Sequence, residues 1–506
     1  MKDKNVSVIT RREFLRRAAC AAVGTAAMTS AIRDLRFMNA AVAQSNITDY
    51  KALVCIFLAG GNDSNNMIMP TATSEYNNYS AIRTPVLAIP QNNLLPLKKS
   101  DGTDYLDPDG HTFGLHPACP ELQQLFKDGK LAVLMNAGTL VMPITRAQYQ
   151  SGGQRPPQLF SHADQVTQWQ TSVPDQPALT GWGGRCADLL NSVNPNAGIS
   201  LSVSLAGANT FEVGNIVSQY AVSTSGAISL NGVSGARLAA LTNILGLPNP
   251  NMQAQAYASV AEHSINTGAL LNNAIAKSAP TNFFTNMFPT KITTPNLGST
   301  FTSTLSAQLK MVARLIEAGS RAAGSPSNGF GMKRQIFFCQ VGGYDLHSGQ
   351  TSYDTNNPGN VIIGAHANLL AELSQSLMVF QQAMEQLGLQ DSVTTFTSSD
   401  FGRTFPSNGQ GSDHGWGSHH LILGGSGASN LASRSVLGGQ TYGKFPTLTV
   451  NGPDDTNTGR WIPTTAIDQY FATIATWFGV DSSNLSTVFP NIGRFAAPNL
   501  GFMKTS

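Results

Sequence analysis

The sequence has few charged residues, few cysteines, and no long run of basic residues. Only 12% of its 506 residues are charged, about half of the ~25% typical of globular domains. Without a Lys/Arg run, the sequence gives no sign of the basic patch that binds nucleic acid. Beyond residue 43, no apolar run reaches the ~18 residues that a membrane-spanning helix needs. We therefore expect no nucleic-acid partner and no membrane span in that part of the chain.

The chain has too few cysteines for a zinc finger or for a fold held together by disulfides. Four of the five cysteines lie beyond residue 43, and none forms a C-x-x-C pair, so zinc-finger and thioredoxin-like sites have no support. Cys55 and Cys339 fall in apolar strand-like runs, where a thiol is expected to be buried and inert. A disulfide between Cys119 and Cys186 remains open.

Glycine, proline and small polar residues take the place of charge. The chain has 48 Gly and 26 Pro, and 41% of its residues are hydrophobic, including 24 Phe. This composition is typical of a loop-rich globular protein with a large core, and it argues against disorder.

The first 43 residues resemble a twin-arginine export signal. Residues 10–16 carry paired arginines followed by Phe-Leu, residues 18–31 are small and apolar, and residues 41–43 have the A-x-A form of a cleavage site. The alternatives are an ordinary secretory leader or an N-terminal helix. This segment holds eight Lys/Arg against three Asp/Glu, which leaves 23 against 26 in the rest. We predict export by the twin-arginine machinery to the periplasm or outside the cell, with a mature chain that starts near Gln44.

Short apolar runs alternate with helix-type segments along the rest of the chain. The predicted strands span residues 53–58, 131–135, 335–341, 393–397 and 420–423, and the predicted helices include 120–127 and 365–387. Continuous apolar runs of this length are typical of strands buried on both faces. The alternation predicts an α/β fold with a mostly parallel sheet covered by helices on both faces. In such a fold, the loops at the carboxyl ends of the strands carry the chemistry.

The stretch from about residue 191 to 328 differs in composition. It is rich in Ala, Asn, Ser and Leu, with helix-type patterns at 235–245, 252–277 and 302–323. We interpret it as an inserted, helix-rich cap region of a domain that spans residues 44–506.

Acidic and histidine residues collect in the loops beside the predicted strands. The candidate metal ligands are Asp63, Asp345, His347, Asp400, Asp413 and His414. Several carboxylates at one edge of a sheet would repel one another, and a divalent cation supplies the missing counter-charge. Mixed Asp/His ligation suits zinc, manganese or iron more than calcium. The pattern therefore predicts one or two divalent metal ions.

The candidate catalytic residues are Ser161, His162, Arg403 and His419. Arg403 would hold a non-bridging ester oxygen, beside two ions about 4 Å apart that clamp the attacking and leaving oxygens. Ser161 begins a predicted helix, where it serves either as an N-cap, with Asp164 in a capping box, or as a nucleophile. His162 is then either a wall residue of the site or a metal ligand.

These residues also have structural interpretations. Asp63 would form an Asx turn or a helix cap, and Asp345 with His347 would close a loop. Four further histidines, His111, His116, His263 and His366, are predicted to be structural, peripheral or ordinary surface and core residues.

Taken together, the motifs resemble the bacterial family called domain of unknown function 1501. The similarity rests on residues 57–63, 113–117, 160–162, 342–347, 400–404, 413–415 and 462–465, and it spans nearly the whole chain beyond the leader. That family is grouped with the alkaline phosphatase and sulfatase superfamily, which implies a metal site at the carboxyl edge of a mostly parallel sheet. Asp63 would match the first-strand metal aspartate. Asp345 with His347 would match the later Asp/His pair.

The resemblance also implies that Asp400 and His414 supply the remaining ligands. The chain departs from the superfamily here, because Asp400 is followed by Phe401 and the Asp-His pair lies downstream at 413–414. A Cys/Ser-x-Pro-x-Arg sequence is absent, which argues against a formylglycine sulfatase.

The superfamily nucleophile would follow the second strand, where Ser161 is the first candidate, ahead of Thr139 and Thr145. We predict an exported metal-dependent hydrolase of phosphate or sulfate esters that acts on a small-molecule or polymer substrate. The alternative is a noncatalytic exported binding or envelope protein that keeps the fold and a structural ion.

Overall fold

The computed structural model describes most of the chain beyond residue 46. The described residues are 47–504 except 196–197, 229, 231, 277–283, 285, 295–299, 324–328, 353–361, 428–429 and 431–433. The predicted leader and its cleavage site lie outside them, as does the side chain of His263. No helix in the described part is both long and apolar enough to cross a membrane.

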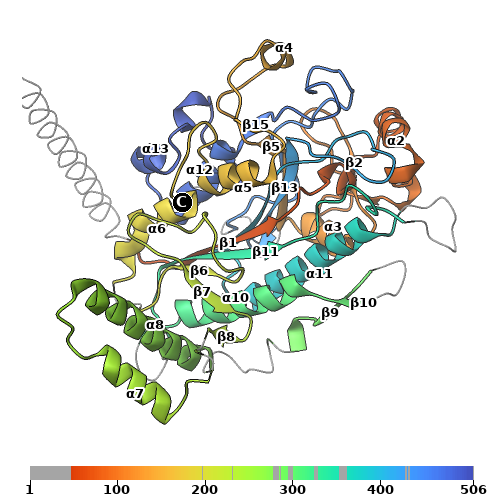
Figure 1. Ribbon diagram of the computed structural model, residues 1–506. Coiled ribbons are helices and arrows are strands. Elements are labelled where there is room, and N and C mark those ends of the chain that lie inside the picture. Colours follow the sequence, from red (N-terminus) through yellow and green to blue (C-terminus); the bar gives the residue numbers. More distant parts are fainter. Residues whose placement is uncertain are drawn as a thin grey trace, which may run out of the picture.

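A ten-stranded sheet forms the centre of the molecule (Figure 1), in the order β14-β5-β13-β12-β1-β11-β6-β7-β8, with β15 pairing to β5. Its strands are β1 (Lys51–Leu58), β5 (Leu131–Gly138), β6 (Ser202–Ser204), β7 (Tyr220–Ser223), β8 (Gly226–Ala227), β11 (Arg334–Val341), β12 (Val393–Ser399), β13 (Ser418–Gly424), β14 (Gln440–Tyr442) and β15 (Thr465–Ala466). β1 lies in the middle, parallel to both β11 and β12. All its residues except Lys51 are buried, as expected for a strand covered on both faces. The predicted mostly parallel α/β sheet is confirmed.

β13 departs from the parallel order. It is antiparallel to both β12 and β5, and at the sheet edge β8 is antiparallel to β7. The chain between β12 and β13 contains no crossover helix, which a parallel connection would require. This loop therefore stays at the carboxyl edge of β12, and β13 starts from that edge.

Helices cover both faces of the sheet (Figure 1). One face packs against α3 (Pro120–Lys127), α10 (Thr304–Ser320) and α11 (Ala365–Gln386), and the other against α5 (His162–Thr171), α6 (Trp182–Leu190) and α12 (Ile467–Phe478). In α11, Leu370, Leu373 and Leu377 are buried at helical spacing, which places one apolar stripe on the core. On the other face, the rings of Trp182 and Phe471 stack with centroids 4.5 Å apart.

The remaining elements surround this body. They are α2 (Thr73–Leu87), α4 (Arg146–Gln150), α7 (Ala236–Leu245), α8 (Met252–Ala276), α13 (Leu485–Val488), β2 (Ile68–Pro70), β3 (Leu95–Pro96), β4 (Phe113–Leu115), β9 (Lys291–Thr293) and β10 (Thr300–Thr302). β2, β3 and β4 form a small antiparallel sheet, and β9 pairs with β10.

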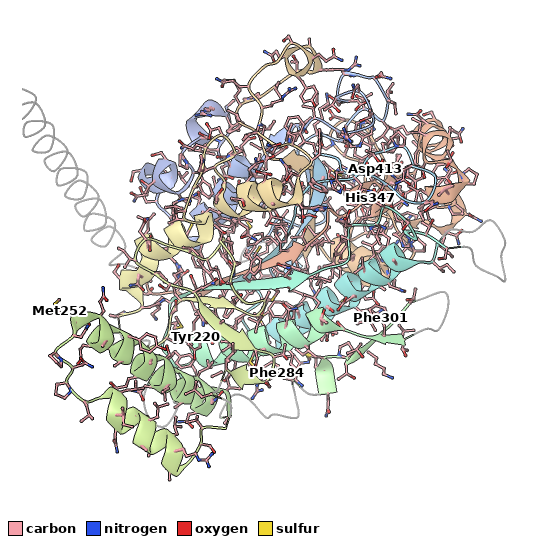
Figure 2. The ribbon with its side chains drawn as sticks, viewed as in Figure 1. Tyr220, Met252, Phe284, Phe301, His347 and Asp413 are labelled. Carbon is pink, nitrogen blue, oxygen red and sulfur yellow. The ribbon has the colours of Figure 1, made fainter. Side chains whose placement is uncertain are left out.

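The region predicted to be a cap is divided between the main sheet and a projecting helix pair. β6 and β7 extend the sheet beyond β11, and α10 buries its apolar stripe against β11 and α11. Among the described elements of this region, α7 and α8 project from the body (Figure 1). Met252, at the start of α8, lies far from His347 and Asp413 (Figure 2). β6, β7 and α10 of this region therefore belong to the central body, and the cap role of the region stays a prediction.

The four described cysteines are buried and free. The thiol of Cys119 donates to the carbonyl of Leu370, with Sγ and O 3.9 Å apart. No disulfide joins Cys119 to Cys186.

Candidate metal centre

Loops that follow β1, β11 and β12 meet at one edge of the sheet. Gly60 lies two residues after β1 and has φ of +116°, a backbone conformation that residues other than glycine rarely adopt. A Cβ atom at Gly60 would collide with the backbone nitrogen of Asp345. Glycine at this position therefore allows the loop after β1 to lie directly against the loop after β11.

The carboxylate of Asp345 lies at the centre of a histidine cluster. Its Oδ1 is 3.1 Å from Nε2 of His347 and 3.3 Å from Nε2 of His414. Its Oδ2 is 3.4 Å from Nε2 of His162. The Nε2 atoms of His347 and His414 are themselves only 2.9 Å apart. The structure thus brings together four of the residues predicted from the sequence.

Each of the three imidazoles already uses its Nδ1 atom. The partners are Asp400 Oδ2 for His162 (2.7 Å), Asp413 Oδ1 for His347 (2.9 Å) and the carbonyl oxygen of Phe160 for His414 (2.7 Å). Figure 2 shows His347 and Asp413 close together. Carbonyl and carboxylate oxygens accept hydrogen bonds, so Nδ1 donates and Nε2 of each neutral ring keeps its lone pair. Outer partners of this kind orient metal-binding histidines.

Aromatic packing holds the imidazoles in place. The ring of Phe401 lies 4.8 Å from that of His162 and 4.6 Å from that of His414 between centroids. Phe160 has φ of +74°, an uncommon conformation for a bulky residue, and its carbonyl oxygen accepts the His414 hydrogen bond. The side chain of His414 is therefore fixed by both packing and hydrogen bonding.

Arg403 lies beneath the cluster and holds Asp345. Its Nη1 donates to Asp345 Oδ1 (2.7 Å) and to the Gly60 carbonyl (3.2 Å), and its Nη2 donates to the Ser412 carbonyl. Burial opposes ionisation of Asp345, but Arg403 and the neighbouring histidines lower the pKa of its carboxyl below the ordinary value. The Arg403 side chain has no exposed surface. It cannot hold a substrate oxygen as the sequence had suggested, because the guanidinium is used to position Asp345.

The cluster carries more negative than positive charge. Three carboxylates, those of Asp345, Asp400 and Asp413, face the single guanidinium of Arg403 and three imidazoles with free Nε2 atoms. Two negative charges are left, which one divalent cation would balance. The side chains of Asp345 and His347 are 43% and 46% exposed, so a ligand from solvent can reach this site.

Asp63 is held apart from this cluster. Its buried carboxylate forms an ion pair with Arg83 of α2 and accepts a hydrogen bond from the side-chain amide of Gln350. Burial opposes its ionisation, but the Arg83 charge lowers the pKa of Asp63. Asp63 thus joins the loop after β1 to α2, and it is not grouped with Asp345 as a ligand set.

Ser161 and His419 also have defined local roles. Ser161 occupies the N-cap position of α5, but its Oγ donates to Asp164 Oδ2 (2.6 Å) and caps no backbone group. His419 lies within β13, where its Nδ1 accepts the backbone N–H of Asn136 and burial lowers its pKa to about 3. The structure does not bring His419 into the cluster.

The other nucleophile candidates and histidines have structural partners. Thr139 is buried and shares a hydrogen bond with Gln165, and Thr145 N-caps α4 in a capping box. The other four described histidines contact neighbouring groups: His116 contacts Ala118, His366 contacts Asn62, His111 contacts Glu75 and His420 contacts Thr397. Asp107, Asp109 and His111 also place possible ligand atoms within 4.8 Å of one another. In that group, an Asx turn of Asp107 accounts for the approach, because its Oδ1 accepts the backbone N–H groups of the other two.

Three residues of this region were not found by sequence reasoning. Phe160 and Phe401 are adjacent to predicted residues, and only the fold shows their packing. Arg460 donates from Nε to the backbone carbonyl of His414 (2.7 Å), 46 positions away in the sequence. No motif around Arg460 signals this contact.

Residues 50–489 match the family described as Protein of unknown function (DUF1501), and the chain belongs to this family. The matched residues include every member of the cluster. No curated protein matches the chain.

Proposed function

We propose that the protein is an exported metal-dependent hydrolase of phosphate or sulfate esters. The observation that carries this proposal is the convergence of three imidazole Nε2 atoms on Asp345, each ring having its Nδ1 bonded to an oxygen. Lone pairs gathered in this way repel one another unless a cation lies between them. Nitrogen and carboxylate donors together fit zinc, manganese or iron.

One ion fits the geometry better than two. The ligand atoms of His162, Asp345 and His414 all lie within 4.8 Å of one another. Three protein ligands leave a coordination position open, which distinguishes catalytic from structural sites. Asp63, predicted to be a further ligand, is neutralised by Arg83. When bound, the ion would polarise an ester oxygen and neutralise the charge that develops on it.

His347 is proposed to accept the proton of the attacking water. Its Nδ1 is oriented by Asp413, whose Oδ1 also accepts a hydrogen bond from Asn408 (2.9 Å). The imidazole is the most exposed of the three, and its Nε2 lies beside that of His414. A histidine held by a carboxylate is suited to general-base catalysis. This role differs from the ligand role that the sequence suggested.

Metal analysis of the exported, unchelated protein tests the proposal. We expect about one equivalent of a transition metal, lost in Asp345→Ala and His414→Ala but kept in His347→Gln and in the control His111→Gln. Hydrolysis of a panel of phosphomonoesters, phosphodiesters and sulfate esters should be lost in Asp345→Ala, His414→Ala and His347→Gln. Ser161→Ala should remain active, because its hydroxyl is bonded to Asp164.

Two results would count against the proposal. Wild-type protein without metal would contradict the ion site. Metal-loaded protein that hydrolyses no ester in the panel would favour the noncatalytic binding protein.

Export is tested separately. Replacing both Arg11 and Arg12 with Lys should keep the precursor inside the cytoplasm, whereas the wild-type chain is expected in the periplasm or medium with its amino terminus near Gln44. Unchanged export of the variant would contradict the twin-arginine route.

A further inference from the structure

Arg460 is a partly buried arginine beside the histidine cluster, and its charge is not neutralised by a carboxylate of any described residue. Its Nε donates to the backbone carbonyl of His414 (2.7 Å). Its guanidinium lies over the ring of Phe160, with Cζ 4.2 Å from the ring centroid. Phe160 in turn accepts the Nδ1 hydrogen bond of His414. Arg460 therefore contacts both a proposed metal ligand, His414, and the residue whose carbonyl oxygen orients that ligand, Phe160.

The contacts of Arg460 use only part of its hydrogen-bonding capacity. Nε is bonded to His414, but neither terminal nitrogen, Nη1 or Nη2, has a hydrogen-bond partner in the described part of the chain. The stack on Phe160 fixes the plane of the guanidinium. Two terminal N–H groups of a fixed guanidinium match two oxygens of a phosphate or sulfate group.

The charge of the site requires such a group. Three carboxylates, one buried guanidinium and one divalent ion sum to zero, so the cluster with its ion would offer an anionic ester no net positive charge. Arg403 cannot supply it, because its side chain is fully buried and bonded to Asp345 and Ser412. Arg460 adds one positive charge next to His414.

We infer that Arg460 binds the anionic phosphoryl or sulfuryl group of the substrate beside the proposed ion. This inference rests on the proposed function and assigns the tetrahedral oxyanion as the group recognised. It makes Arg460 a binding residue and leaves Arg403 to position Asp345.

Arg155 provides a matched control. Its guanidinium also lies over an aromatic ring, that of Tyr149, with Cζ 4.8 Å from the centroid. Its Nη1 donates to the carbonyl of Tyr149 itself, and no described contact links Arg155 to the histidine cluster. Replacing Arg155 therefore removes the same kind of charge and stacking without changing the site.

The test is calorimetric titration of inorganic phosphate, and separately of inorganic sulfate, into the metal-loaded mature protein. Compared with the wild type, Arg460→Gln should bind the anion about 10- to 100-fold more weakly, as expected for the loss of charged hydrogen bonds. Arg155→Gln should bind as the wild type does, and both variants should keep their metal. With an active ester, Arg460→Gln should raise KM more than it lowers kcat, and Arg460→Lys should restore part of the affinity.

Several outcomes would overturn the inference. Equal anion affinity in the wild type and Arg460→Gln, or a metal-loaded wild type that binds neither anion, would overturn it while leaving the proposed function in place. Loss of metal from Arg460→Gln would instead make Arg460 a positioning residue for His414. A wild type that binds no metal would overturn the proposed function, and this inference with it.

Discussion

The Nε2 atoms of His347 and His414 lie 2.9 Å apart, although each ring already donates a hydrogen bond from Nδ1 to an oxygen. Between two neutral rings in this state there is no proton to share. The approach is explained by a cation bound beside them or by protonation of one ring. Because Asp345 and the further ring of His162 face the same point, we favour the cation.

The two carboxylates that hold imidazole rings are expected to have different effects. Asp400→Asn replaces the carboxylate that orients His162 with a neutral amide, whose single oxygen cannot occupy both acceptor positions, the one for His162 and the one for the backbone N–H of Gly60. We therefore expect metal affinity to fall about 10- to 100-fold. Asp413→Asn acts on His347, so metal content should persist while ester hydrolysis falls by about 100-fold or more. Competition with a chelator and initial rates measure the two effects. The reverse pattern would make His347 a ligand and His162 the proton acceptor.

Gly60→Ala should disrupt the site from outside the ligand set. A side chain at Gly60 meets Asp345, whereas one at Gly102, which also has positive φ, meets no atom within 4 Å. Both substitutions carry the strain of a left-handed backbone, about 1–2 kcal/mol. We expect Gly102→Ala to show only this loss in urea unfolding, and Gly60→Ala to lose bound metal as well. Retention of full metal content by Gly60→Ala would contradict the proposed contact between the two loops.

Asp468 should make the protein less stable as the pH rises. It is buried in α12, neither of its carboxyl oxygens has a hydrogen-bond partner among the described residues, and burial raises its pKa to about 8. The unfolded chain has the ordinary value of about 4, so between these values the folded state binds the extra proton. The contribution of Asp468 to the free energy of unfolding is therefore greatest below about pH 4. It falls by up to about 1.4 kcal/mol per pH unit as the pH rises towards 8.

Asp468→Asn should remove this dependence. The variant should gain stability over the wild type as the pH increases from 5 to 8, measured by urea unfolding at each pH. Parallel pH profiles for the two proteins would show that Asp468 is ionised in the folded state.

The thiols should be unreactive in the native protein. Burial raises the pKa of Cys55 and Cys339, and raises that of Cys186 to about 12. In a chain lacking residues 1–43, a chromogenic thiol reagent should detect no reactive thiol while the protein is folded. After unfolding it should detect four thiols per chain. Its melting temperature should be the same with and without a reductant. Two equivalents on unfolding would indicate a disulfide that the structure does not contain.

Local patterns were sufficient to predict much of the secondary structure. The strands β1 and β11 contain continuous apolar runs, β12 is a buried run of mostly Thr and Ser with Val393 and Phe396, and α11 has a periodic apolar stripe. Burial of such runs depends mainly on their own composition, so their type and approximate limits can be predicted from the sequence. The direction of β13 could not, because it depends on where the preceding loop ends.

The sequence by itself determined that acidic and histidine residues occupy the loops at one edge of the sheet, since each follows or precedes a recognisable strand. Only the tertiary structure decided which charges meet. Arg83 of α2 neutralises Asp63, and Arg403 is buried against Asp345, which removes one candidate ligand and one candidate substrate contact. A buried charge is stable only with a partner, and that partner is chosen by packing between distant segments, which no local motif records.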